Sequence, residues 1–436
     1  MKRGKKYGML QLSEGNADDE GLAPNKQRMT SLGSQIPQVA ILTGGFDKPY
    51  ALGLASSLIA HGVAFEFIGS DEIDGPQLHH NPLVRFLNLR GNQRSNVSVR
   101  KKVARVIIYY LRLFRYAVTA EPKIFHILWS DRFHFLDRAL LPLFYRLLGR
   151  HIVLTVHNVN SAKRDGNDSM LNRLTLRTQY HLVDHLFVHT EQMKRELATD
   201  FMISDRKISV IPFGINSTVP NTDLTTAEAK DRLGLTYHHK ALLFFGNIAP
   251  YKGLEYLVEA MSFLPQDKAD YRLIIAGRLK ECAPYWSEIQ RQIARANLED
   301  FVIKRIEYIP DEETEIFFKA ADVLVLPYKH IFQSGVLFLG YNFGLPAIAS
   351  DVGSLKEEIL EGETGLITPV KDPESLARTI QEYFESDLYN NLEVQRAKIR
   401  RYADNRYSWA KVATLTTCVY SRLLGRRVGK NSEVAS

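Results

Sequence analysis

The feature that most constrains the fold of this chain is an alternation of short apolar runs with longer amphipathic segments. Each apolar run has the length of a buried strand, and each amphipathic segment has the spacing of a helix that covers a sheet. The pattern therefore predicts βαβ units and a mostly parallel sheet. In the first half, strands are expected at residues 39–43, 64–68, 125–129, 152–156, 186–189 and 208–211.

The same pattern begins again near Ala241, which indicates a second sheet. Its strands are expected at residues 242–245, 272–276, 302–304, 323–326 and 347–349. Helices that fit between strands include residues 50–62, 253–263, 285–297 and 312–321.

The two halves predict an α/β fold of two doubly wound, Rossmann-like domains that face each other across a cleft. In this class, ligands bind at the carboxyl ends of the strands. Residues 213–228 are rich in turn formers and predict a linker. The expected parts are a polar tail (1–36), an N-terminal domain (37–212), the linker, a C-terminal domain (229–405) and a final helix with a polar tail (406–436).

Composition narrows the function classes. The formal net charge of +7 permits anionic partners without requiring them. Residues 1–36 lack the apolar core of a signal peptide, and no run of 18 apolar residues predicts a membrane span. We therefore expect a cytoplasmic protein. No Cys/His cluster has metal-ligand spacing, and no recognition-helix, zinc or stacking motif predicts a nucleic-acid partner.

Two loops at predicted strand ends carry groups that suit phosphate binding. In the first, Lys252 opens a helix at the carboxyl edge of the sheet, where it can meet a phosphate as a mobile charge. The alternative is a solvated lysine at a helix start. In the second, Ser334 is a good N-cap, and the free amides of Gly335 and Val336 would form an anion site. An ordinary capped helix is the alternative there.

Further motifs follow in a fixed order. The C-terminal half has a lysine–glycine loop, an A-A-D-V strand, a G-x-P run and a T-G turn, at residues 246–253, 320–327, 344–353 and 361–366. The N-terminal half has Gly44-Gly45, Thr155-Val-His157, His189-Thr-Glu191 and residues 211–215. In this order and spacing, residues 38–420 resemble the retaining family 4 (group 1) glycosyltransferases of the GT-B fold.

The resemblance implies transfer of a sugar from a nucleotide diphosphate-sugar, as co-substrate, to a hydroxyl of a glycan or lipid-linked acceptor. This chemistry would serve glycan, exopolysaccharide or glycolipid synthesis. It implies no cofactor and no metal, because lysine and helix amides would stabilise the leaving diphosphate. The residues expected at the diphosphate are Gly45, Asn247, Lys252, Ser334, Gly335 and Val336.

Other positions match the family's functional residues. Lys252 and His157 are the expected catalytic residues, and Gln333 and Glu357 are expected at the donor sugar or ribose. His157 has a strand-end histidine as its alternative, and Glu357 a helix-capping acid. Further site residues implied are His189, Glu191 and Arg278.

The chain departs from the family in two places. The E-x7-E glutamates, expected near Ile331 and Leu339, are absent, and residues 333–336 form a Q-S-G-V loop instead. Asn247 replaces an arginine, so Lys252 would carry the phosphate charge alone or with Arg278 or Lys329. These departures leave open a nucleotide-sugar 2-epimerase of the same fold and a non-catalytic sugar-nucleotide-binding protein.

Residues 75–120 contain no acidic residue. Basic and apolar residues interleave over residues 98–118, which predicts a basic amphipathic helix. Such helices can lie on anionic membranes, which would place the protein peripherally on the inner face. The alternative is a domain helix that packs its apolar side on the sheet and leaves its arginines in solvent.

Overall fold

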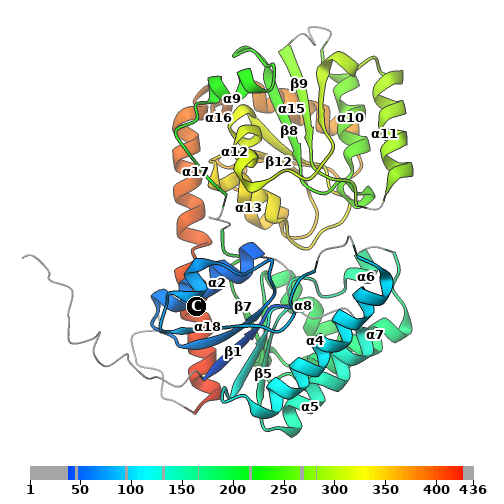
Figure 1. Ribbon diagram of the computed structural model, residues 1–436. Coiled ribbons are helices and arrows are strands. Elements are labelled where there is room, and N and C mark those ends of the chain that lie inside the picture. Colours follow the sequence, from blue (N-terminus) through cyan, green and yellow to red (C-terminus); the bar gives the residue numbers. More distant parts are fainter. Residues whose placement is uncertain are drawn as a thin grey trace, which may run out of the picture. The chain divides into compact units, whose positions relative to one another are not determined.

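The computed structural model describes residues 38–44, 48–93, 97–129, 133–164, 166–215, 219–265, 270–280 and 282–425 (Figure 1). The compact unit Ile36–Ser436 holds two sheets whose paired strands are parallel. This confirms the expected fold of two Rossmann-like α/β halves. The limits set for the individual domains stay predictions.

The first sheet has the strand order β3-β2-β1-β4-β5-β6-β7. Its strands are β1 (Val39–Leu42), β2 (Phe65–Gly69), β3 (Val84–Asn88), β4 (Ile124–Ile127), β5 (His151–Thr155), β6 (His185–Val188) and β7 (Ile208–Val210). The order reverses between β1 and β4, and the carboxyl ends of these strands therefore frame the crevice of a doubly wound fold.

Helices cover both faces of this sheet. Ala40 and Leu42 pack in one core with residues of α4, α5 and α7, whereas Val39 and Ile41 pack in another with residues of α2. This alternation is the two-residue period of a strand buried on both faces. The helices are α2 (Lys48–Ala60), α3 (Pro76–His79), α4 (Val99–Thr119), η1 (Leu136–Leu140), α5 (Leu141–Leu147), α6 (Ser161–Arg164), α7 (Met170–Leu182), α8 (Glu191–Asp200) and η2 (Asp205–Lys207).

The second sheet has the order β10-β9-β8-β11-β12-β13 and reverses between β8 and β11. Its strands are β8 (Lys240–Phe245), β9 (Tyr271–Ala276), β10 (Val302–Arg305), β11 (Val323–Leu326), β12 (Ala347–Ser350) and β13 (Gly365–Thr368). Its helices are α9 (Thr226–Arg232), η3 (Pro250–Lys252), α10 (Leu254–Phe263), α11 (Ala283–Arg295), η5 (Glu299–Phe301), α12 (Asp311–Ala320), α13 (Gly335–Asn342), α14 (Leu355–Glu358), α15 (Pro373–Glu385), α16 (Asp387–Asn390) and α17 (Leu392–Arg406).

A buried ion pair joins α9 to the start of the second sheet. Lys230 Nζ lies 2.9 Å from Asp322 Oδ2, and the two side chains are 4% and 6% exposed. The same carboxylate oxygen accepts a bond from the Ala241 amide at 2.7 Å, and Lys230 donates to the His239 carbonyl at 2.7 Å. Helix α9 itself begins inside the predicted linker, because Thr225 and Glu228 form a capping box.

The last described helix, α18 (Trp409–Leu423), returns to the first sheet and lies beside α2 (Figure 1). Ser57 donates to the Trp409 carbonyl at 2.6 Å, and the Trp409 indole donates to the Ile215 carbonyl at 2.7 Å. Farther along, the Tyr420 hydroxyl contacts His126 Nδ1 at 2.6 Å. The final helix is thus part of the N-terminal half's core, which sequence reasoning did not predict.

Across the described ranges, no helix is long and apolar enough to cross a membrane.

Candidate active site

A pocket of about 410 Å³ opens at the carboxyl ends of strands from both sheets. Trp129 follows β4, and His157 follows β5; from the second sheet, Gly246 follows β8, Arg278 follows β9, and the loop after β11 supplies Gln333. This is where a doubly wound fold binds its ligands. The other described lining residues are Asn158, Phe213, Phe245, Asn247, Tyr251, Lys252, Gly277, Tyr308, Ile309, Tyr328, Ile331, Ser334, Gly335 and Val336.

Lys252 is a buried cation in this pocket, with only 5% of the residue exposed. Its ammonium donates to the Phe245 carbonyl at 3.3 Å and lies 5.2 Å from the centre of the Tyr328 ring. No carboxylate among the described residues forms an ion pair with it. Burial lowers the pKa of Lys252 to about 8. A bound anion would restore the solvation that the ammonium has lost.

The backbone around Lys252 depends on glycine. Gly253 has φ +66°, and a Cβ there would lie 2.0 Å from the Pro327 carbonyl oxygen. The left-handed turn at Gly253 ends η3 and begins α10, and it lets the loop close against β11. Any larger residue would displace the loop that carries the lysine.

Helix α13 begins at Gly335, as the sequence predicts. The predicted cap is wrong, however, because the Ser334 side chain makes no cap bond to the helix. Its hydroxyl instead points to the Tyr328 hydroxyl at 3.4 Å. The first amides of a helix have no partner within the helix, so those of Gly335 and Val336 are left to serve a ligand in the pocket.

The second cation of the pocket is Arg278, whose Nε donates to Asn247 Oδ1 at 3.1 Å. Asn247 therefore orients this guanidinium. Lys329 is not part of the lining; it pairs with Glu255 at 2.8 Å.

His157 lies on the opposite side, stacked on Trp129 with ring centres 4.6 Å apart. Its Nδ1 contacts His189 Nε2 at 3.2 Å, and His189 Nδ1 contacts the Ile211 carbonyl at 3.3 Å. A carbonyl only accepts, so the network assigns the His189 proton to Nδ1 and the His157 proton to Nδ1. His157 Nε2 then keeps a lone pair, and it is buried without a hydrogen bond.

Both histidines are neutral at physiological pH. Burial lowers the pKa of His157 well below its ordinary value, and the neighbouring His189 adds to the effect. Burial lowers the pKa of His189 to about 4. His189 is not among the described residues that line the pocket, so it can affect a ligand there only through its contact with His157.

Gln333 lines the pocket with an unsatisfied amide. It lies near enough to Glu358 to lower that carboxyl's pKa, which burial raises overall. Yet neither Gln333 Oε1 nor Nε2 makes a hydrogen bond of acceptable geometry. An amide in this state is suited to bind the hydroxyls of a ligand.

The structure does not bring every predicted residue into the pocket. Glu357 is nearly half exposed and lies 3.8 Å from Arg195 Nη2, while its neighbour Glu358 is the buried carboxyl. Glu191 opens α8 and is absent from the described lining. Gly45 lies outside the described residues.

Sequence reasoning missed several lining residues, including Trp129, Asn158, Phe213 and Tyr308. Each follows a strand at its carboxyl end, which was the signal available for all of them; Phe213 also lies within the motif at residues 211–215. In the described part of the chain, no group of three or more His, Cys, Asp or Glu side chains is suited to hold a metal ion.

Comparisons with known proteins agree with the family resemblance found in the sequence. The family model described as "Glycosyl transferases group 1" matches residues 239–386, and that described as "Glycosyltransferase Family 4" matches residues 49–219. The D-inositol 3-phosphate glycosyltransferase of Corynebacterium efficiens is 28% identical over 285 residues, which cover 62% of this chain and 64% of the relative. The match thus spans less than two thirds of that relative's length.

Solved structures share the fold. The sucrose-phosphate synthase of Thermosynechococcus elongatus aligns with a TM-score of 0.69 at 20% identity, over 89% of this chain and 99% of that one. Anabaena HepE in complex with UDP-glucose aligns with a TM-score of 0.65 at 15% identity, over 88% and 99%.

Proposed function

The chain belongs to the group 1 glycosyltransferases, and on this premise we propose that it transfers a sugar from a nucleoside diphosphate-sugar to an acceptor hydroxyl. One observation carries the proposal: the buried ammonium of Lys252, with no carboxylate partner among the described residues, shares a pocket with Arg278 and the α13 amides. A diphosphate is the ligand whose charge and oxygens suit these donors.

The transferred sugar leaves a diphosphate whose charge grows as the glycosidic bond breaks. Lys252, Arg278 and the amides of Gly335 and Val336 are fixed donors that would stabilise this charge, which lowers the barrier. His157 Nε2 would accept a hydrogen bond from a hydroxyl of the sugar, and the Gln333 amide would bind another. His189 acts as a positioning residue that fixes the His157 tautomer.

We propose that the reaction retains the anomeric configuration. None of the described residues lining the pocket is acidic, so they offer no carboxylate to form a glycosyl-enzyme intermediate. Since His157 Nε2 is taken up by a sugar hydroxyl in this proposal, the base left for the acceptor proton is an oxygen of the departing phosphate, which lies on the face that the leaving group vacates. Attack from that face gives retention.

The donor is tested directly with purified protein. UDP-glucose is the first candidate, because the structurally similar HepE was solved with it. We expect UDP-glucose or another UDP-, GDP- or ADP-sugar to bind and to be hydrolysed slowly without acceptor. If the product formed without acceptor is a sugar epimerised at C2, the result would favour the 2-epimerase. If the donor binds without any turnover, the result would favour the non-catalytic alternative.

We also propose that turnover needs no metal, because two cations and helix amides of the chain serve the diphosphate. Activity in excess EDTA should equal that without it. Loss of activity with EDTA that manganese or magnesium restores would contradict this prediction.

Helices α4 and α5, which pack on the first sheet, present a surface suited to a membrane. Helix α4 buries Tyr109, Leu113 and Tyr116, yet Ile107 and Leu111 on its other side are 54% and 63% exposed. Phe114 packs on Phe144 of α5 with ring centres 5.1 Å apart, and Leu147 at the end of α5 is 77% exposed. The helix thus packs one side on the sheet and leaves apolar residues of its other side exposed.

We propose that this surface binds an anionic leaflet at the cytoplasmic face, near a membrane-proximal acceptor. Each basic side chain contributes about 1 kcal/mol near such a leaflet. The wild type should sediment with anionic vesicles at low salt, and replacing Arg100, Lys101 and Lys102 by Gln should release it. Equal recovery in the supernatant with anionic and neutral vesicles would refute membrane binding.

A further inference from the structure

Two neighbouring residues in the loop between β11 and α13 are buried in different halves of the protein. Ile331 is 8% exposed and belongs to a hydrophobic core whose buried members all lie between residues 215 and 407. Phe332 is 4% exposed and belongs to a core whose other buried members all lie between residues 40 and 208. The side chain of Phe332 therefore reaches from the second half of the chain into the core of the first.

The backbone of this loop is anchored to the second half. The Ser354 amide donates to the Phe332 carbonyl at 3.0 Å. Gly353 has φ +58°, and a Cβ there would lie 1.9 Å from the Ile331 carbonyl oxygen. The turn after β12 thus holds the loop by a close backbone contact that needs glycine. We expect the loop to keep this position when only the Phe332 side chain is shortened.

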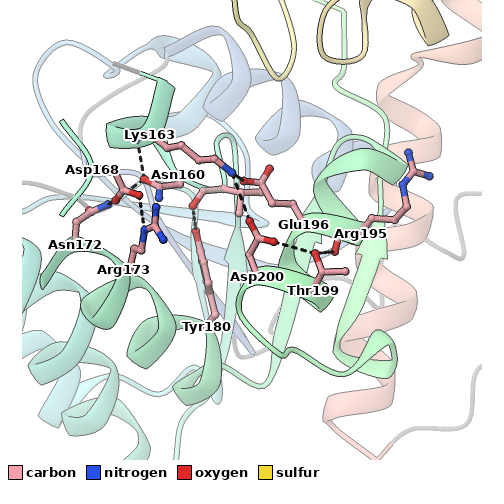
Figure 2. A network of polar contacts seen from close by, with 11 residues as sticks. Asn160, Lys163, Asp168, Asn172, Arg173, Tyr180, Arg195, Glu196, Thr199 and Asp200 are labelled. Carbon is pink, nitrogen blue, oxygen red and sulfur yellow. Dashed lines mark hydrogen bonds and ion pairs between the residues drawn. The ribbon is translucent and has the colours of Figure 1, made fainter. Parts of the chain in front are cut away.

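On the first half, α6 and α8 form the seam beside Phe332, that is, the boundary between the two halves. Phe332, Lys163, Gln192 and Glu196 are among the residues that line a hollow of about 260 Å³. Lys163 lies 3.6 Å from Glu196 and 3.5 Å from Asp200, so these ion pairs connect α6 with α8 (Figure 2). Because a hollow adjoins the Phe332 ring, the two halves are not closely packed all along this seam.

An ion pair also crosses the seam. Arg195 Nη2 of α8 lies 3.8 Å from Glu357 Oε1 of α14, and the two side chains are 67% and 47% exposed. Exposed pairs of this kind add little stability, whereas the burial of an aromatic ring is strongly favourable. Of these two contacts, the Phe332 ring is therefore the one that fixes the first half against the loop.

Phe332 lies between the two sides of the donor pocket. The residue that follows it, Gln333, lines the pocket, and α13 begins at Gly335. On the other side, α8 begins two residues after His189, whose Nε2 contacts His157 Nδ1 at 3.2 Å. The ring thus connects the loop of the diphosphate site with the helix that follows His189.

Resting on the proposed function, we propose that Phe332 is a positioning residue, whose ring holds Gln333 and the first α13 amides opposite His157. Phe332 is not among the described residues that line the donor pocket, so it acts through its neighbours rather than on the ligand. Its effect belongs to turnover, because the groups that act together in the transition state come from both halves. A displacement of about 1 Å between such groups can lower the rate by about 100-fold.

The test compares binding with turnover in the Phe332→Ala variant of the full chain. Calorimetry measures the affinity for UDP, and the hydrolysis of UDP-glucose gives kcat and KM. The UDP affinity should stay within about twofold of the wild type, because Lys252, Arg278 and the α13 amides all belong to the second half. The kcat should fall by roughly 10- to 100-fold. Phe332→Leu, which keeps a smaller apolar side chain, should recover most of the kcat.

Hydrogen exchange reports the anchor itself and does not depend on turnover. Exchange of the α8 amides, which lie in the other half, should become faster in Phe332→Ala. The matched control is Phe384→Ala on α15, since Phe384 is 5% exposed, belongs to a core of the second half and is absent from the described pocket lining. Both alanine variants remove a buried ring and should lower the thermal midpoint. Only Phe332→Ala should change α8 exchange and kcat.

The outcomes separate the two proposals. If UDP does not bind to the wild type, the proposed function fails, and the role of Phe332 fails with it. If UDP binds, three results would overturn the role of Phe332 and leave the donor function standing: an unchanged kcat in Phe332→Ala, a loss of UDP affinity as large as the loss of kcat, or α8 exchange no faster than in Phe384→Ala.

Two further cases keep the test decisive. If the wild type binds UDP but does not hydrolyse UDP-glucose, α8 exchange decides. If Phe332→Ala does not fold, Phe332→Leu takes its place, and its α8 exchange should exceed that of Phe384→Ala by a smaller margin. Equal exchange in the two would overturn the proposal.

Discussion

Lys252→Met should weaken the binding of UDP-glucose at pH 7 by roughly 10- to 100-fold, which corresponds to about 1.5–3 kcal/mol for a charge-assisted contact. Methionine keeps an apolar stem of similar length and removes the ammonium, which lies 5.9 Å from the centre of the Phe244 ring and 5.2 Å from that of Tyr328. Calorimetry with the wild type and the variant measures the difference. An unchanged affinity would remove Lys252 from the diphosphate site.

The same lysine should make donor binding depend on pH. In the free protein its pKa is about 8, so the ammonium is charged below that pH and neutral above it. Wild-type affinity for UDP-glucose should therefore fall as the pH rises through 8. Lys252→Arg, which stays charged, should bind with an affinity that is flat over this range.

Lys252→Met should also stabilise the free protein at pH 7. Burial lowers the lysine pKa from 10.5 to about 8, so the folded state holds a charge it disfavours. Below pH 8 this costs up to about 3 kcal/mol, at 1.36 kcal/mol per pKa unit. Between pH 8 and 10.5, Lys252 loses its proton in the folded state but keeps it in the unfolded chain. The contribution of Lys252 to the free energy of unfolding of the wild type therefore rises with pH in this range.

Asp322→Asn should lower the free energy of unfolding by about 3–5 kcal/mol, because it leaves the Lys230 ammonium buried and unpaired. Lys230→Met should lower the free energy of unfolding by a similar amount, because it leaves the Asp322 carboxylate buried without its cation. The double variant should lose less than the sum of the single changes. Urea denaturation measures all three.

A matched control lies on α11, where Arg291 Nη2 and Glu288 Oε2 are also only 2.6 Å apart but both side chains are about half exposed. Glu288→Gln should cost less than about 1 kcal/mol. Because Asp322 does not line the donor pocket, the folded Asp322→Asn variant should bind UDP-glucose normally. A single-variant cost near that of the control would refute the role given to the buried pair.

Sequence reasoning located the strands buried on both faces, such as β1, β9 and β11, and also the partly exposed edge strands β7 and β10. It missed β3 and β13, each of which is one of the two edge strands of its sheet. In β3 most residues are partly exposed, so Val84–Asn88 shows no continuous apolar run. In β13 the apolar pair Leu366-Ile367 is flanked by Gly365 and Thr368, so it did not stand out as a strand.

The donor pocket was predictable where a loop has a distinctive sequence, as at Lys252 and residues 333–336. It was not predictable where a contact depends on chain segments far apart. The bond between His157 and His189 spans 32 residues, and the Asn247–Arg278 pair spans 31. Glu357 is not among the described lining residues for a local reason: in the four-residue helix α14, Glu357 is exposed and the next residue, Glu358, is buried.

The return of α18 to α2 makes the first sheet's structural unit discontinuous in the chain. Its core includes Val412, Ala413 and Tyr420, which are synthesised more than two hundred residues after β7. During synthesis on the ribosome, the apolar face of α2 therefore stays uncovered until α18 has emerged. The part of the protein that is made first is completed last, and a truncation before Trp409 would expose that face for the lifetime of the molecule.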